Sequence, residues 1–186
     1  MTTMTTEVVG LPRGRALTRD DLDQMSDDGH RYELLDGILV VSPAPRRIHQ
    51  RVSGNLHLAL RAACPADLEI LYAPFDVVLA KDTVIQPDLL IAPREPFVDR
   101  ELPGPPVLAV EVLSPSTRGI DLLLKRERLQ RAGCAHYWVV DPDEPSITAW
   151  ALRDGQYQQA GRAVGDEVLV LVEPIEVSLV SAALLG

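Results

Sequence analysis

Residues 107–113 have the sequence VLAVEVL, an apolar run broken by a single acidic residue, Glu111. Both alternating sets of positions in this run are apolar, which is typical of a strand covered on both faces of a sheet. A carboxylate in such a strand is costly unless it is paired with a cation or bound to a metal ion. The run therefore predicts a central strand and identifies Glu111 as a candidate functional residue.

Two other acidic residues lie in apolar sequence that suits strands. Asp88 lies within the predicted strand 84–92, and Glu33 lies within the predicted strand 31–35. Neighbouring strands could bring Asp88 and Glu111 together, where each carboxylate would raise the pKa of the other. A hard divalent cation between them would remove this repulsion, since Mg²⁺ commonly takes one or two carboxylates together with water and phosphate oxygens. The alternative for Glu111 is a salt bridge with a lysine or arginine.

The remaining sequence alternates helical and strand-like segments. Asp36-Gly37 and Asp154-Gly155 are hairpin-turn signals, and the proline-rich stretch 93–106 predicts a loop. The expected helices are a short one after Thr18, then 47–63 and 121–132. The other expected strands are 38–42, 68–80, 107–113, 136–142, 146–152, 156–160, 167–172 and 175–179. This order predicts a mixed α/β (α+β) domain built around one sheet, residues 18–186, preceded by a flexible tail, residues 1–17.

The composition excludes several classes of protein. Apolar residues make up 46% of the chain and charged residues 24%, which is typical of a globular protein and not of a disordered or fibrous one. No apolar run approaches the roughly 18 residues of a membrane span, and the N-terminus does not resemble a secretory signal. The cysteines, Cys64 and Cys134, are too few for a disulfide framework and are expected to be small core residues. We therefore expect a cytoplasmic protein with no membrane partner.

The charge distribution bears on nucleic-acid binding. The formal net charge is −9, whereas nucleic-acid-binding proteins normally offer basic surface to phosphates. Local basic segments nevertheless occur. One contains Arg46, Arg47, Arg51 and Arg61, with His49 among them as a further candidate for phosphate contact, and the other spans 118–131. Nucleic-acid binding would therefore have to use a local surface.

Asp121 and Lys125 form a second candidate element. They are four residues apart in the predicted helix 121–132, so they share one helical face. Taken alone, this spacing favours an ordinary helix salt bridge that contributes a few tenths of a kcal/mol.

The combination of motifs resembles a known family. Residues 111–117 (EVLSPST), then Asp121 and Lys125, then 137–142 (YWVVDP) resemble the signature of the Uma-type restriction endonuclease family, in the PD-(D/E)XK nuclease superfamily. Upstream, YELLDG at 32–37 and QPDL at 86–89 also match in order. The resemblance covers about residues 18–180. It departs from the superfamily pattern at Leu113, where the lysine is expected, and Lys125 matches a lysine displaced onto the following helix.

The resemblance implies a restriction endonuclease-like fold and a nuclease that depends on Mg²⁺ or Mn²⁺. The implied catalytic residues are Glu33, Asp88, Glu111 and Lys125, and the implied metal ligands are Asp88, Glu111 and the carbonyl of Val112. The expected partner is nucleic acid, with DNA as the first choice, and two cuts in a duplex would suit a homodimer. RNA or a smaller phosphodiester would use the same residues. The other alternative is a catalytically silent binding or assembly module with this fold.

Overall fold

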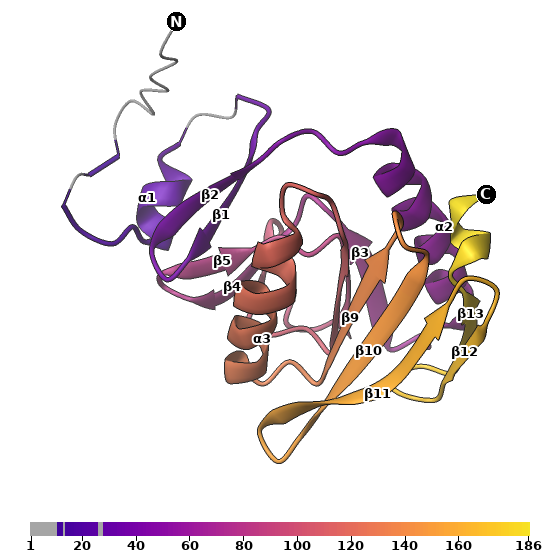
Figure 1. Ribbon diagram of the computed structural model, residues 1–186. Coiled ribbons are helices and arrows are strands. Elements are labelled where there is room, and N and C mark those ends of the chain that lie inside the picture. The colour runs from indigo at the N-terminus through magenta and orange to yellow at the C-terminus, as the bar shows by residue number, and fades with distance from the viewer. Residues whose placement is uncertain (1–10, 13, 26–27) are drawn as a thin grey trace, which may run out of the picture.

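A computed structural model describes residues 11–12, 14–25 and 28–186 (Figure 1). Its helices are α1 (Arg19–Asp23), α2 (Arg47–Ala63), the π-helical η1 (Ile120–Lys125), α3 (Arg126–Ala132) and the 3₁₀ turn η2 (Ala182–Leu185). Its strands are β1 (Arg31–Leu35), β2 (Ile38–Ser42), β3 (Leu68–Tyr72), β4 (Asp76–Ala80), β5 (Thr83–Ile85), β6 (Leu89–Pro93), β7 (Glu101–Pro103), β8 (Leu108–Val112), β9 (His136–Asp141), β10 (Ser146–Arg153), β11 (Gln156–Val164), β12 (Val168–Leu171) and β13 (Val177–Val180).

The strands form three sheets, so the expectation of one sheet was wrong. The largest has the order β11-β10-β9-β8-β6-β3, the second has the order β2-β1-β5-β4-β7, and β12 pairs with β13. As predicted, β8 is a central strand: it pairs antiparallel with β6 and parallel with β9, and all five of its residues are buried. The mixed pairing confirms the predicted α/β fold class.

Two segments predicted as single strands are each split between the two large sheets. The segment 68–80 becomes β3 and β4, interrupted around Ala73-Pro74, and the segment 84–92 becomes β5 and β6, interrupted at residues 86–88. Proline has no N–H to donate to a sheet, so Pro74 and Pro87 favour these breaks. The Ala73 N–H donates to the Asp88 carbonyl at 3.1 Å, which ties the two crossings together. Apolar composition alone does not reveal such crossings.

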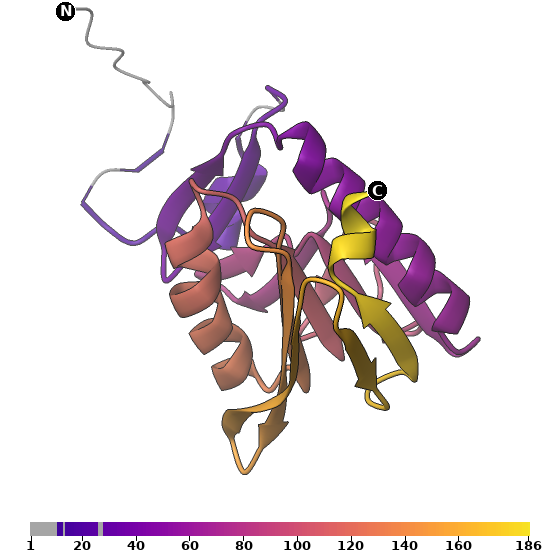
Figure 2. The ribbon, with the colours of Figure 1, turned by 45° about the vertical axis from the view of Figure 1, so that its right-hand side comes forward.

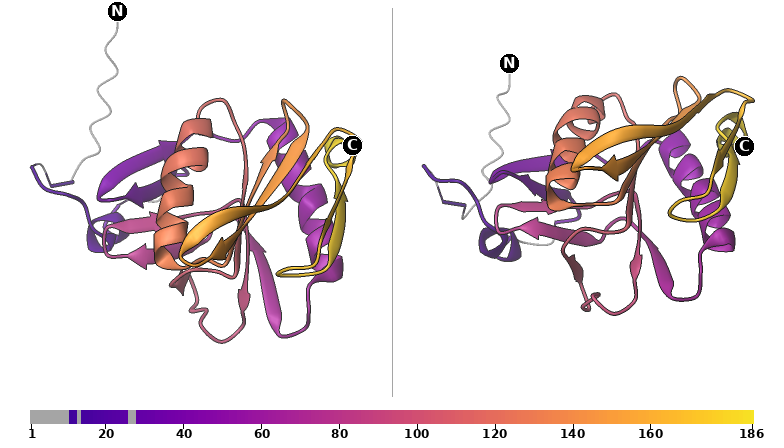
Figure 3. Two further views of the ribbon diagram at one scale, coloured as in Figure 1. Left: turned by 60° about the horizontal axis from the view of Figure 1, so that its bottom comes forward. Right: turned by 90° about the horizontal axis from the view of Figure 1, so that it is seen from below.

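The six-stranded sheet is covered on both faces, as Figure 2 shows: α3 lies on one side, and α2 with β12 and β13 on the other. Alternate residues of β8 separate accordingly. Leu108 and Val110 join the apolar cluster that contains Leu56 of α2, whereas Ala109 joins the cluster that contains Leu129 of α3. The views in Figure 3 show the same layers from below. Since Glu111 follows the parity of Ala109, its side chain belongs to the α3 face.

The helices follow the sequence with one exception. Helix α2 has the predicted bounds, and its buried residues Val52, Leu56 and Leu60 follow the i, i+4 pattern. The predicted helix 121–132 is instead a π-helical segment, η1, that continues into α3. Gly133 ends α3 in the left-handed region, at φ 86°. The π-helical segment carries Asp121 and Lys125, and such segments occur frequently at functional sites.

Several local predictions can be compared with the structure. Asp36 and Gly37 both have positive φ, as the predicted hairpin turn requires, and α1 begins with a capping box at Thr18. The predicted loop 93–106 contains the short strand β7, and β11 runs four residues beyond its predicted end at 160.

The predicted tail 1–17 lies largely outside the described residues. Within the described part, Leu17 is buried and its N–H donates to the Gly37 carbonyl at 2.9 Å. Among the described residues, no helix is both long and apolar enough to cross a membrane.

Candidate active site

Two of the four candidate catalytic residues, Glu33 and Glu111, contact the ammonium group of a third, Lys125. Lys125 Nζ lies 2.9 Å from Glu33 Oε1 and 3.0 Å from Glu111 Oε1. It also lies 3.5 Å from Asp121 Oδ1, the helix pair expected from spacing alone. The side chains of Lys125, Glu33 and Glu111 are each no more than 3% exposed. The ion pairs of Lys125 are therefore buried. They connect η1 to strands β1 and β8, in addition to the i, i+4 pair with Asp121 within η1.

Asp88 completes the site from the other side. Its Oδ2 accepts a hydrogen bond from the Val112 N–H at 2.8 Å, and Arg31 Nη1 lies 3.1 Å from its Oδ1. His49 Nε2 lies 3.1 Å from Oδ2. An ionised carboxylate can only accept, so Nε2 carries the hydrogen in this contact. We call Arg31, Glu33, Asp88, Glu111, Asp121 and Lys125 the charged cluster.

The charged cluster forms where the two large sheets meet. Arg31 and Glu33 come from β1 of the five-stranded sheet, whereas Glu111 comes from β8 of the six-stranded sheet. Asp88 immediately precedes β6, at the crossing between the sheets. Asp121 and Lys125 come from η1. The site thus depends on how the sheets and η1 pack together.

Burial and charge set the protonation preferences in the cluster. Burial is the main reason that the pKa of Glu111 lies well above its ordinary value. The positive charge of Lys125 lowers this pKa, but the negative charges of Asp121 and Asp88 raise it again. Burial likewise raises the pKa of Asp121. Burial alone would also raise the pKa of Asp88, but the hydrogen bond from His49 and the charge of Arg31 outweigh it and hold the pKa below its usual range.

Lys125 remains a cation. Burial by itself would lower its pKa, but the charges of Glu111 and Glu33 more than compensate and raise the pKa above its ordinary value. At neutral pH its ammonium group can donate hydrogen bonds and stabilise negative charge. It cannot accept a proton.

Sequence reasoning missed part of this constellation. Arg31 was not singled out, although it precedes Glu33 by two residues in a strand, a spacing that puts both side chains on one face. His49 was considered only for phosphate contact, and Asp121 only as a helix ion-pair partner. For Asp121, the signal was its position one turn before a candidate catalytic lysine.

Gln86 supports the site from its border. Its N–H donates to Glu33 Oε1 at 2.7 Å, and its side-chain Nε2 donates to Asp76 Oδ1 at 2.7 Å. The side chain therefore points to Asp76, and the Gln86 backbone helps to position Glu33.

The donor set suits a divalent cation in charge and chemistry. Its four carboxylates, those of Glu33, Asp88, Glu111 and Asp121, face only two permanent cations, Arg31 and Lys125, which leaves two excess negative charges when all are ionised. Asp121 Oδ1 is buried and has no hydrogen-bond partner. In the described residues, no group of three or more His, Cys, Asp or Glu side chains is arranged to hold a metal ion. A cation here would depend on Asp88, Glu111 and non-side-chain ligands.

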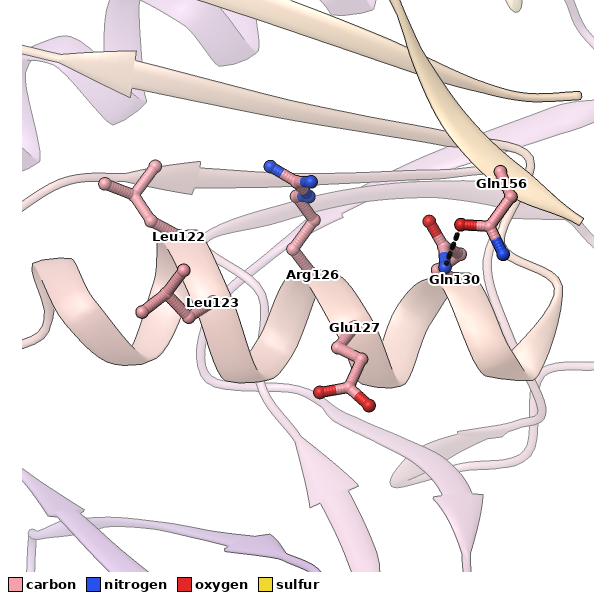
Figure 4. A pocket seen from close by; sticks show the side chains of 6 residues that line it. All are labelled: Leu122, Leu123, Arg126, Glu127, Gln130 and Gln156. Carbon is pink, nitrogen blue, oxygen red and sulfur yellow. Dashed lines mark hydrogen bonds between the residues drawn. The ribbon is translucent and has the colours of Figure 1, made fainter.

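A small open pocket lies elsewhere on the surface, along η1 and α3 (Figure 4). It is lined by Leu122, Leu123, Arg126, Glu127, Gln130 and Gln156, none of which belongs to the charged cluster. The side-chain amide of Gln130 donates to Gln156 Oε1 at 3.2 Å across it. The chemistry of the cluster, and not this pocket, therefore defines the candidate active site.

The fold and the sequence were both compared with those of known proteins. The chain is similar to the crystal structure of a putative nuclease belonging to DUF820 from Anabaena variabilis ATCC 29413, with a TM-score of 0.71 and 15% identity over 91% of this chain and 99% of that chain. At this identity the likeness shows the fold alone. No curated protein matches. Residues 19–183 match the family described as "Putative restriction endonuclease" (Uma2), so this chain belongs to that restriction endonuclease-like family.

Proposed function

We propose that this protein is a metal-dependent nuclease that hydrolyses phosphodiester bonds in DNA. The observation that carries the proposal is the hydrogen bond from the Val112 N–H to Asp88 Oδ2, at 2.8 Å. It holds the Asp88 carboxylate against the backbone next to Glu111. The two proposed metal ligands are 23 residues apart in the sequence. The hydrogen bond nevertheless places the Asp88 carboxylate beside the stretch of β8 that carries Glu111.

The proposed metal ligands are Asp88, Glu111 and the Val112 carbonyl, with Mg²⁺ or Mn²⁺ as the cation. Such a cation supplies polarisation of the phosphodiester and lowers the pKa of bound water. Carboxylate and carbonyl oxygens are the donors these hard cations prefer. The four carboxylates of the cluster outnumber its two permanent cations, Arg31 and Lys125, which supports this assignment.

Lys125 acts electrostatically in this proposal. Its ammonium group is charged and held by Glu33 and Glu111, so it can donate to an attacking water or to oxygens on which negative charge grows. Glu33 Oε1 already accepts from the Gln86 N–H and contacts Lys125. The role of Glu33 is therefore to orient Lys125.

Local charge supports nucleic acid as the substrate. Residues 37–66, which include α2, hold four arginines, two histidines and no carboxylate, in a chain of net charge −9. Helix α2 reaches the site through His49. Its exposed arginines would lie near phosphates flanking the cleaved bond.

The test combines cleavage and metal binding. We expect the wild-type protein to cleave plasmid DNA with Mg²⁺ or Mn²⁺, and Asp88→Asn and Lys125→Ala to lose this activity. Asp166→Asn, an exposed acidic residue, is the matched control and should cleave normally. Equal cleavage by all four proteins would indicate a contaminant. Cleavage of RNA in place of DNA would overturn the choice of substrate.

A silent binding module makes a different prediction for stability. A cation that binds only the folded protein must raise the thermal midpoint. A midpoint unchanged by Mg²⁺ and Mn²⁺, together with no cleavage, would favour the binding module.

We further propose a homodimer, because two cuts in a duplex suit a two-fold axis. Light scattering of the purified protein tests this assembly.

A further inference from the structure

Arg31 occupies a particular place in the charged cluster. Its Nη1 lies 3.1 Å from Asp88 Oδ1, and its Nη2 lies 3.7 Å from Glu33 Oε1. Asp88 Oδ2 is already engaged by the Val112 N–H and by His49. Arg31 is therefore the group that neutralises the remaining oxygen of Asp88, an oxygen that a divalent cation would also need.

Arg31 is also the outermost permanent charge of the cluster. Its side chain is 23% exposed, compared with 6% for Asp88 and 3% for Lys125. It comes from the five-stranded sheet, whereas Lys125 is buried among three carboxylates from different elements. The guanidinium group can therefore swing outward without opening the core. Lys125 cannot do so.

The hydrogen bonding of Arg31 leaves it free to move. A guanidinium group carries five N–H donors, and Arg31 Nε is buried without a hydrogen-bond partner. The ion pairs of Arg31 in the described chain are those to Glu33 and Asp88. Within the described part of the chain, the hydrogen bond and ion pairs that hold the guanidinium all lie inside the charged cluster, and a partly satisfied donor set lowers the cost of leaving.

A cation and Arg31 cannot share Asp88 without strong repulsion. An arginine does not give up its proton at accessible pH, so it can make room only by moving. Like charges a few ångströms apart in a partly buried site repel by much more than they do in water. Binding of a cation at Asp88 Oδ1 therefore favours displacement of the guanidinium.

We propose that Arg31 is an exchangeable counter-ion that neutralises Asp88 in the metal-free protein and is displaced when a divalent cation binds. This inference rests on the proposed metal site. It assigns Arg31 a positioning role that sets the affinity of the site for its cation.

The test measures the binding of Mn²⁺ alone, by calorimetry and by the paramagnetic signal of free Mn²⁺. Arg31→Ala and Arg31→Gln remove the competing charge, and the glutamine keeps a hydrogen-bond donor in case the alanine variant does not fold. Both should bind Mn²⁺ at least about tenfold more tightly than the wild type. Arg31→Lys restores the charge and should return the affinity toward the wild-type value. Arg94→Ala, which removes an arginine paired with Glu69 away from the cluster, is the matched control and should change nothing.

The outcomes separate this inference from the proposed function. Tighter binding by the neutral variants, with or without measurable binding by the wild type, supports the exchange. Equal or weaker binding by the neutral variants, while the wild type binds, would overturn it and leave the metal site standing. If neither the wild type nor the neutral variants bound Mn²⁺, the proposed metal site would fail, and the exchange with it.

Discussion

Lys125 Nζ lies 3.0 Å from Glu111 Oε1, and both side chains are buried, although one residue belongs to η1 and the other to β8. Such a pair gains its attraction only after both charges have left water, so its net contribution to stability is small. Breaking it by removing one partner is different, because the remaining charge stays buried. The pair therefore fixes the geometry of the site, and replacing only one partner is expected to lower the free energy of unfolding by a large amount.

Replacing Lys125 by methionine should destabilise the protein strongly. The change leaves Glu33 and Glu111 without their shared cation, and uncompensated buried charges of this kind cost about 3–5 kcal/mol. Urea denaturation of the metal-free protein measures the loss. The double variant Lys125→Met with Glu111→Gln removes one of the stranded charges and should recover part of it. A loss below about 1 kcal/mol, the usual value of an exposed pair, would contradict the burial of this contact.

Replacing Gly37 by alanine should destabilise the β1–β2 hairpin more than backbone strain explains. Gly37 has φ +75°, and an added Cβ would meet Ala16 Cβ at 2.5 Å and the Leu17 backbone at 3.0 Å. Gly155 has φ +74° but open space around it, so Gly155→Ala measures the strain alone. We expect a loss of about 1–2 kcal/mol for Gly155→Ala and clearly more for Gly37→Ala. Equal losses in chemical denaturation would mean that the segment at 16–17 moves aside freely.

The buried thiol of Cys134 should make stability depend on pH above pH 9. Burial raises the pKa of Cys134 from 9.0 to about 11. The folded protein therefore keeps this proton at pH values where the unfolded chain has lost it. The contribution is fully present below pH 9.0 and is lost as the pH rises to about 11, by up to roughly 2–3 kcal/mol.

Cys134→Ala isolates this effect from other groups that titrate in alkali. Unfolding free energies of both proteins at about pH 8 and about pH 10.5 give the comparison. The wild type should lose more stability between the two pH values than the variant does. Parallel losses would show that the thiol reaches solvent in the folded protein.

Arg47 should contribute to nucleic-acid binding through phosphate contact. It is exposed, lies in the first turn of α2, and belongs to the segment 37–66 that contains no carboxylate. Arg47→Ala should weaken binding of a short DNA duplex and reduce the slope of log K against log salt concentration by about 0.9. Fluorescence anisotropy in Ca²⁺ over a range of salt concentrations measures both quantities. Arg162 is an exposed arginine on β11, an edge strand of the six-stranded sheet, and Arg162→Ala should leave the slope unchanged.

The sequence predicted the elements of the site better than their arrangement. Glu111, Asp88 and Glu33 were detectable because a charged residue in an apolar strand is costly and implies a partner. The split of 84–92 into β5 and β6 was not detectable, because both halves are apolar and suit either sheet. Pro87 was the available signal for this break, and it was interpreted only as part of a motif.

The sequence by itself determined the fold class, the central strand β8 and helix α2, because hydrophobic periodicity and turn signals depend on near neighbours along the chain. It also singled out Glu33, Asp88 and Glu111 as acidic residues in apolar strands, whereas Lys125 became a candidate only through the family resemblance. Only the tertiary structure decided that Lys125 pairs with Glu33 as well as Glu111, and that Arg31 and His49 reach Asp88. Arg31 and Asp88 are 57 residues apart. Their contact arises where the two large sheets meet, and the packing of one sheet against another depends on the whole chain and is not encoded in any local pattern.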